Sequence, residues 1–172
     1  MALHLGGPVN TVKAAWPHMV AQRYGKIVLT TSVVGLFGMR GQATYAAAKS
    51  AVGGLMRLLA VEGAEHGILV NTISPVGYTR MHPAAGSRVS EADGKAAAPV
   101  EAVAPAIVWL ASDGCSDTSR IYHVEAGAIQ RIAIVMGPGF YDPHLTPERI
   151  AENYAKIESI QGFSEPGSFE PG

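Results

Sequence analysis

Two short apolar runs joined by a long helical pattern constrain the fold of this chain more than any other feature. Lys26–Ser32 and Ile68–Ile73 are rich in β-branched residues and lack a helical period, which is typical of strands buried on both faces. Between them, from Ala43 to Gly67, small and apolar residues recur at helical spacing. A strand, a helix and a strand in this order predict a right-handed crossover between parallel strands. We therefore expect an α/β sheet.

Weaker patterns predict the remaining elements. Apolar residues at three- and four-residue spacing indicate a helix over Val9–Tyr24. Pro17 inside it is a mild contradiction. Gly25 is expected to end the helix, because glycine readily adopts the left-handed conformation. Further expected elements are a loop marked by Gly35, Gly38 and Gly41, a mobile loop over Met81–Ala98, a helix over Val100–Ala111, a strand over Arg120–Val124, a short apolar segment after Ala126–Gly127, and a last helix opened by Thr146, Pro147 and Glu148.

Length and composition narrow the class of protein. The 172 residues suffice for one domain, expected over residues 1–161, with a flexible tail rich in Gly, Pro, Ser and Glu over residues 162–172. A net charge of −1 gives no sign of a nucleic-acid partner. Cys115 is the single cysteine and no Cys and His cluster has zinc-site spacing, so we expect no metal. Without a signal peptide or a run of about 18 apolar residues, we expect a cytoplasmic protein with no membrane partner.

Tyr45 and Lys49 form the pair that most strongly indicates catalysis. Four residues apart, they stand on one helix face, so the Lys49 ammonium can lie near the Tyr45 phenol and favour the phenolate. Tyr45 could then act as a general acid or base. Ser32 ends the preceding strand, where parallel sheets place their ligands, and could hold a substrate oxygen. Alone, however, such a pair is common on helices as two solvated side chains, and such a serine as a turn or cap residue.

The run from Tyr24 to Met81 resembles the short-chain dehydrogenase/reductase family in motifs that agree in order and spacing. These are the Gly-Lys-Ile-Val strand, the Thr-Ser at its end, Tyr-Ala-Ala-Ala-Lys, Val-Asn-Thr-Ile-Ser-Pro and Thr-Arg-Met. A closer likeness, through Ala-Ala-Trp-x-His-Met, Pro-Ala-Ile-Val-Trp-Leu and Leu-Thr-Pro-Glu, is to the (3R)-hydroxyacyl-CoA dehydrogenase domain of peroxisomal multifunctional enzymes. The resemblance covers most of the chain.

The resemblance implies an oxidoreductase that uses NAD or NADP and acts on an alcohol or ketone, with a 3-hydroxyacyl-CoA as one candidate substrate. In the matching positions Ser32 would orient the substrate, Tyr45 would exchange the proton, and Lys49 would hold the nicotinamide ribose. Family members commonly assemble through their long helices, so a homo-oligomer is also implied.

A second set of matching residues follows the second strand. Pro75, Gly77 and Thr79 correspond to the family's loop that contacts the nicotinamide. The Pro75-Val76-Gly77 run departs from the usual Pro-Gly, which leaves the register of this loop open. Thr79 is interpreted equally well as an ordinary turn or cap residue.

The family's glycine-rich phosphate turn, Thr-Gly-x-x-x-Gly-x-Gly, has no counterpart in this sequence. We therefore expect the C-terminal catalytic half of the fold: a partial Rossmann-like parallel sheet with flanking helices, lacking the N-terminal nucleotide-binding strands. His4 stands where many members have an asparagine of the proton relay. It either substitutes for that asparagine or is a solvated terminal residue, and we favour the second interpretation.

Two further hypotheses stay open beside the oxidoreductase. In the first, the chain is a catalytically weak or inactive homologue that serves as an oligomerisation or interaction module. In the second, it is a fragment of a longer gene. Turnover of NADH or NADPH and the oligomeric state would distinguish them.

Overall fold

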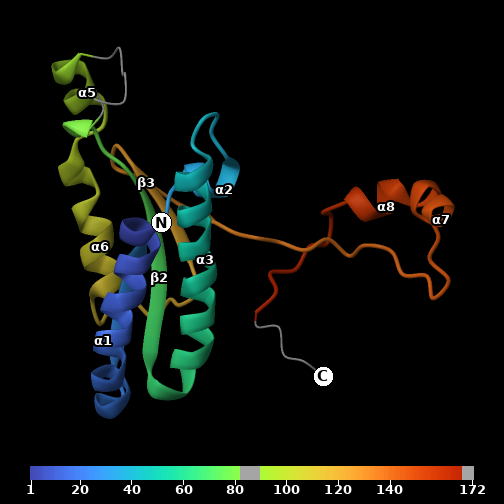
Figure 1. The fold of residues 1–172 in the computed structure, drawn as a ribbon, viewed down its shortest axis with the longest axis horizontal. Helices are drawn as coiled ribbons and strands as arrows, with labels where there is room; N and C mark the ends of the chain where they lie inside the picture. Colours follow the sequence, from blue (N-terminus) through green and yellow to red (C-terminus); the bar gives the residue numbers. More distant parts are fainter. Residues whose placement is uncertain (82–89, 168–172) are drawn as a thin grey trace. The chain divides into compact units, whose positions relative to one another are not determined.

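The structure is a computed structural model that describes residues 1–81 and 90–167 (Figure 1). Contacts divide the chain into two compact units, Met1–Ile132 and Ala133–Gly172. Each unit is described by itself. The expected division into a domain over residues 1–161 and a tail over residues 162–172 stays a prediction.

The first unit contains a four-stranded sheet. Its order is β1 (Gly25–Thr30), β2 (Ile68–Val76), β3 (Ile121–Glu125) and β4 (Ala128–Ile132). Strands β1, β2 and β3 are parallel, which confirms the predicted α/β fold.

Strand β4 pairs antiparallel with β3, so the sheet is mixed at this edge, a detail that the predicted parallel sheet did not include. Ala126 and Gly127 join the two strands with φ of 48° and 84°. Two consecutive residues of positive φ make the tight turn that suits a β-hairpin. The short apolar segment expected after Ala126–Gly127 therefore forms a strand, β4.

The helices of the first unit are η1 (Ala2–Gly6, one π-helical turn), α1 (Gly7–Gln22), α2 (Val33–Phe37), α3 (Ala43–Gly63), η2 (Ala64–His66, 3₁₀), α5 (Glu91–Ala97), η3 (Val100–Ala102, 3₁₀) and α6 (Ala104–Ala111). The long α3 and the strands on each side of it confirm the predicted strand–helix–strand unit.

Two short helices lie where loops were expected, and a serine caps each one. The Ser32 hydroxyl accepts from the Val34 N–H at the start of α2, within the glycine-marked stretch. The Ser90 hydroxyl accepts from the Asp93 N–H at the start of α5, so the predicted loop over Met81–Ala98 is wrong for residues 91–97. Capping supplies a partner that propensity alone does not reveal. Residues 82–89 of that expected loop lie outside the described residues.

Helix α1 ends differently from the expectation, although its existence is confirmed. The left-handed residue is Arg23, with φ of 53°, and Gly25 is already the first residue of β1. A Cβ atom at Gly25 would lie 2.7 Å from the Met19 sulfur. Gly25 therefore serves the close approach of α1 to β1 rather than the helix end.

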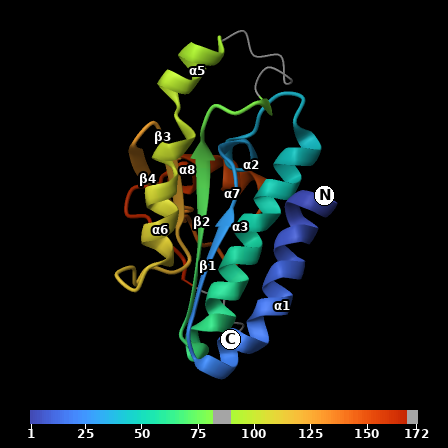
Figure 2. The same ribbon diagram turned by 90° about the vertical axis from the view of Figure 1, so that its left-hand side faces the viewer.

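Apolar side chains on the two faces of the sheet form separate clusters. On one face the strands pack against α1 and α3, through a cluster that includes Ile27, Val70 and Met56. On the other face Ile73 packs with Leu110 of α6. Helices consequently cover both faces of the sheet (Figure 2), which explains why apolar residues of the strands pack on both sides.

The second unit contains two short helices, α7 (Pro147–Glu152) and α8 (Tyr154–Glu158). Thr146 caps α7 by accepting from the Arg149 N–H at 3.3 Å, as the sequence predicts. Within the expected tail, Ser164 makes two backbone hydrogen bonds of 2.9 Å with Met136, so this part of it is anchored.

One stretch of the described chain, Glu91–Ala111, is long and apolar enough to cross a membrane by length and composition. It is not a single helix, because α5 ends before Ala98 and Pro99 precedes η3. The expectation of no membrane partner stays a prediction.

Truncating the core of α3 tests this packing. Met56 is fully buried, whereas Leu58 is 55% exposed on the same helix. We expect Met56→Ala to lower the free energy of unfolding by about 2–5 kcal/mol, because it leaves a cavity, and Leu58→Ala by at most about 0.5 kcal/mol. Urea denaturation measures both values. Equal effects of the two substitutions would contradict the described packing of α3.

Candidate functional site

Lys49 lies in the middle of α3, with 8% of its surface exposed, and its ammonium is held by the end of β1. The Lys49 Nζ donates to the Thr30 carbonyl at 2.9 Å. In the other direction, the Thr31 hydroxyl donates to the Lys49 carbonyl at 2.7 Å. Burial lowers the pKa of the Lys49 ammonium from its ordinary value, since the charged form loses water. These two bonds fix the position of α3 along β1.

Tyr45 lies one helical turn before Lys49, half-buried, as the spacing predicts. The Lys49 Nζ is 5.8 Å from the centre of the Tyr45 ring, close enough for an attraction between the cation and the ring. The structure thus brings this predicted pair together.

His4 also contacts Tyr45, which corrects the interpretation of a solvated terminal residue. The two ring centres are 5.1 Å apart, with an angle of 89° between the ring planes, an edge-to-face arrangement. His4 is half-buried in η1. The sequence position next to the N-terminus favoured solvent exposure, but η1 lies against α3 and carries the imidazole to the tyrosine.

Ser32 lies two residues after the end of β1 and is half-buried. Its hydroxyl oxygen accepts from the Val34 N–H at 3.2 Å, so Ser32 is a helix cap. A cap uses the oxygen as an acceptor and leaves the hydroxyl proton for a second partner. The role in orienting a substrate is compatible with this geometry and stays a prediction.

Gly35 is a residue of the site that sequence reasoning missed. A Cβ atom there would lie 2.8 Å from the Lys49 Cβ and 2.8 Å from the Ser50 backbone nitrogen. The Ser50 hydroxyl also donates to the Gly35 carbonyl. Helix α2 therefore packs directly on α3 at Lys49, and the signal for it was a glycine facing a run of small residues.

Local structure explains the residues predicted after the second strand, Pro75, Gly77 and Thr79. Pro75 is paired with Val124 in the sheet. A Cβ atom at Gly77 would lie 3.0 Å from a methyl group of Val100. The Thr79 hydroxyl accepts from the Met81 N–H at 3.3 Å, which agrees with the interpretation as a turn residue. Contact of these residues with a nicotinamide stays a prediction.

The residues fit one part of a nicotinamide nucleotide and not another. The Lys49 ammonium, which lies at the carboxyl end of β1, offers a hydrogen-bond donor for a ribose hydroxyl. The glycine-containing start of α2 does not offer a phosphate cradle, because the space beside Gly35 is filled by Lys49 and Ser50. Among the described residues, no three His, Cys, Asp or Glu side chains gather as metal ligands.

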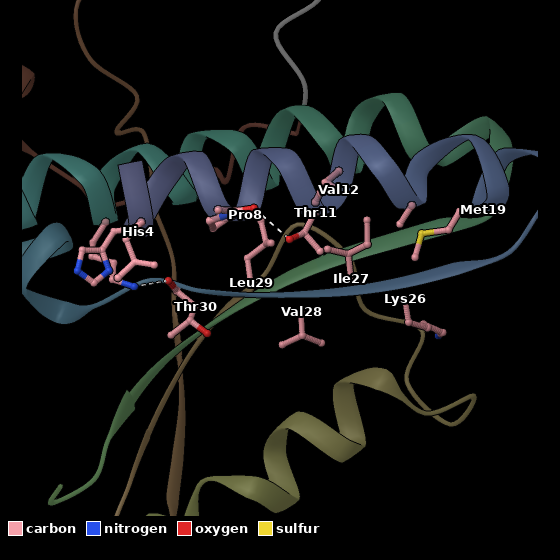
Figure 3. Close-up of a pocket in the computed structure, with 14 residues that line it drawn as sticks. His4, Pro8, Thr11, Val12, Met19, Lys26, Ile27, Val28, Leu29 and Thr30 are labelled. Atoms are coloured by element: carbon pink, nitrogen blue, oxygen red, sulfur yellow. Dashed lines mark hydrogen bonds between the residues drawn. The ribbon is translucent and has the colours of Figure 1, made fainter. Parts of the chain in front are cut away.

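A groove of about 520 Å³ borders this site between α1 and the edge of β1 (Figure 3). His4, Thr30 and Lys49 are among its lining residues. The Tyr45 and Lys49 pair is thus next to a space large enough for a ligand or a peptide segment.

A family model described as short chain dehydrogenase matches residues 1–89, more than half of the chain. The chain belongs to the short chain dehydrogenase family. It is 34% identical over 168 residues to a short-chain type dehydrogenase/reductase of Mycobacterium tuberculosis, covering 94% of this chain and 56% of the relative. It is 35% identical to peroxisomal multifunctional enzyme type 2 of Mus musculus, covering 98% of this chain and 23% of the relative.

A solved structure agrees with these matches. Full-length peroxisomal multifunctional enzyme type 2 from Drosophila melanogaster superposes with a TM-score of 0.79 at 27% identity, over 97% of this chain and 30% of that one. This chain of the short chain dehydrogenase family therefore spans about half, or less, of the length of these relatives.

The buried ammonium makes stability depend on pH in a defined direction. Because the pKa of Lys49 is lower in the folded chain than its ordinary 10.5, the unfolded state binds more protons between these two values. We expect the free energy of unfolding of the native chain to rise relative to that of Lys49→Met as the pH increases toward 10.5. Urea denaturation across the alkaline range measures this difference, and a constant or falling difference would contradict the burial of Lys49.

Proposed function

We propose that this chain carries the proton-transfer machinery of an oxidoreductase that interconverts an alcohol and a ketone with NAD or NADP. The carrying observation is the Lys49 Nζ, buried and 5.8 Å from the centre of the Tyr45 ring. Membership in the short chain dehydrogenase family supports the reaction class.

In this mechanism Tyr45 moves the proton. During oxidation the substrate hydroxyl gives its proton to the Tyr45 phenolate, and during reduction the phenol returns it to the oxygen of the ketone. The Lys49 ammonium stabilises the phenolate through its position beside the ring. A nicotinamide nucleotide, with its ribose held by Lys49, would supply or accept the hydride of this reaction.

Ser32 and His4 have supporting parts. The Ser32 hydroxyl, which caps α2 through its oxygen, donates its proton as a hydrogen bond to the substrate oxygen. The His4 ring holds the Tyr45 ring by edge-to-face contact and limits its rotation. Both residues thereby fix the reacting atoms without exchanging the proton themselves.

The proposed substrate class is a 3-hydroxyacyl thioester and its 3-oxo form. Support comes from the resemblance of Ala-Ala-Trp-x-His-Met and the Pro-Ala-Ile-Val-Trp-Leu segment to the corresponding domain of peroxisomal multifunctional enzymes. The match to the mouse enzyme of that name over 98% of this chain supports the same class.

A second candidate function is an interaction module without turnover. The space beside Gly35 is filled by Lys49 and Ser50, so the described residues there leave no room for a pyrophosphate. This packing favours the interaction module. Turnover by the purified chain decides between the two functions.

Substitution of Tyr45 tests the proposal. With acetoacetyl-CoA and NADH or NADPH, we expect Tyr45→Phe to lower the rate of nucleotide oxidation about 10²- to 10⁴-fold, because the proton donor is lost. Tyr141→Phe, which removes the hydroxyl of an 85% exposed tyrosine, serves as the matched control and should leave the rate unchanged. Absorbance of the reduced nicotinamide is the measurement. Absence of turnover in the native chain, or equal rates for Tyr45→Phe and the native chain, would overturn it.

A further inference from the structure

Helix α5 meets the rest of the described chain at a glycine. Gly94 is the one buried residue of this seven-residue helix, and the others are exposed. A helix of this length is too short to be stable by itself in water, so its place depends on what it packs against. Figure 2 shows α5 beyond the carboxyl end of β2.

The ring of Tyr78 occupies the space in front of Gly94. A Cβ atom at Gly94 would lie 2.2 Å from the Tyr78 Cδ2 and 2.6 Å from its Cγ. Tyr78 lies two residues after the end of β2 and is 7% exposed. Because the contact includes the base of the ring as well as its edge, an added methyl group would displace the whole ring or the helix. We call this packing the Tyr78–Gly94 contact.

Backbone contacts extend the attachment on either side of the ring. The Tyr78 N–H donates to the Ala98 carbonyl at 2.7 Å, and the Ala98 N–H donates to the Gly94 carbonyl at 3.0 Å. A Cβ atom at Gly77 would lie 3.0 Å from a methyl group of Val100, in the segment that follows α5. The loop after β2 is therefore attached to α5 and to the residues that follow it.

Tyr78 stands between two residues that are predicted to contact the nicotinamide, Gly77 and Thr79. The carboxyl ends of the parallel strands β1 and β2 meet at one edge of the sheet, so this loop lies at the edge that also carries Ser32. The Tyr78 ring does not need to touch a nucleotide to affect its binding. A displacement of the ring moves the backbone on both sides of it.

We propose that Tyr78 is a positioning residue, whose ring, packed on Gly94, holds Gly77 and Thr79 in the conformation that receives the nicotinamide. Helix α5 is the fixed support of this loop, and its glycine is required because no side chain fits in front of the ring. The inference rests on the proposed oxidoreductase function for its ligand. The Tyr78–Gly94 contact itself can be tested without a nucleotide.

Gly94→Ala is the decisive variant. Alanine forms helices more readily than glycine, so the substitution favours α5 as a helix and disturbs its contact with the ring. Gly54→Ala on α3 is the matched control, because Gly54 is an exposed helical glycine with open space around an added Cβ atom. The control should behave as the native chain does in every measurement.

The first measurement is amide exchange by NMR without nucleotide. The Tyr78 amide should exchange at least about tenfold faster in Gly94→Ala than in the native chain, because displacement of the ring opens its bond to Ala98. The Thr72 amide, which donates to the Arg120 carbonyl at 2.9 Å within the sheet, should be unchanged. It reports that the core remains folded.

The second measurement is binding of NADH and NADPH, followed by the fluorescence of the nucleotide. In Gly94→Ala the Kd should rise at least about tenfold, because the loop spends most of the time outside the receptive conformation. A loss of folded protein alone would lower the amount of nucleotide bound at saturation and leave the Kd unchanged. Since binding is measured directly, absence of turnover would overturn the proposed oxidoreductase function and leave this test in force.

A double variant tests whether the two residues act through each other. Tyr78→Ala removes the ring, and with it the need for a glycine at position 94. Gly94→Ala should therefore change neither the exchange nor the Kd further in the Tyr78→Ala chain. Tyr78→Ala by itself should give the same two changes as Gly94→Ala, so it carries the test if Gly94→Ala does not fold.

Four outcomes would overturn the inference. The first is unchanged exchange of the Tyr78 amide in folded Gly94→Ala, and the second is a native Kd in that variant. The third is additive effects of the two substitutions. The fourth is a native chain that binds neither nucleotide, because the loop would then have no nicotinamide to receive.

Discussion

A reciprocal pair of hydrogen bonds between β1 and α3 determines the arrangement of the site. The Lys49 Nζ donates to the Thr30 carbonyl, and the Thr31 hydroxyl donates to the Lys49 carbonyl. A lysine buried to 8% exposure would be costly without such a partner. Since both bonds join the same two elements, they fix the register of α3 on the sheet. Tyr45, one turn earlier on α3, and Ser32, next after Thr31, are placed by the same link.

The sequence was sufficient to predict those elements whose apolar residues follow from how the element is buried. β1 and β2 pack against helices on both faces, so their apolar residues do not follow a two-residue alternation, and this pattern made the strands predictable. Tyr45 and Lys49 were predictable as neighbours because helical geometry alone joins residues four apart. The family resemblance was confirmed by the match over residues 1–89.

Other features depended on contacts that a linear pattern does not contain. Helix α2 owes its start to the Ser32 cap and its position to the close approach at Gly35, and both lay inside an expected loop. The antiparallel β4 depends on positive φ at Ala126, a residue that seldom adopts it. His4 was assigned to solvent from its place near the N-terminus, whereas packing places its ring on Tyr45.

The central claim is that the Lys49 ammonium is held at the end of β1 beside the Tyr45 ring, and a crystal structure of the purified chain tests it most directly. This account predicts the Lys49 Nζ within about 3 Å of the Thr30 carbonyl oxygen, with the Tyr45 ring on the same side of α3. A Lys49 side chain extended into solvent, with Thr30 bound to another donor, would contradict it.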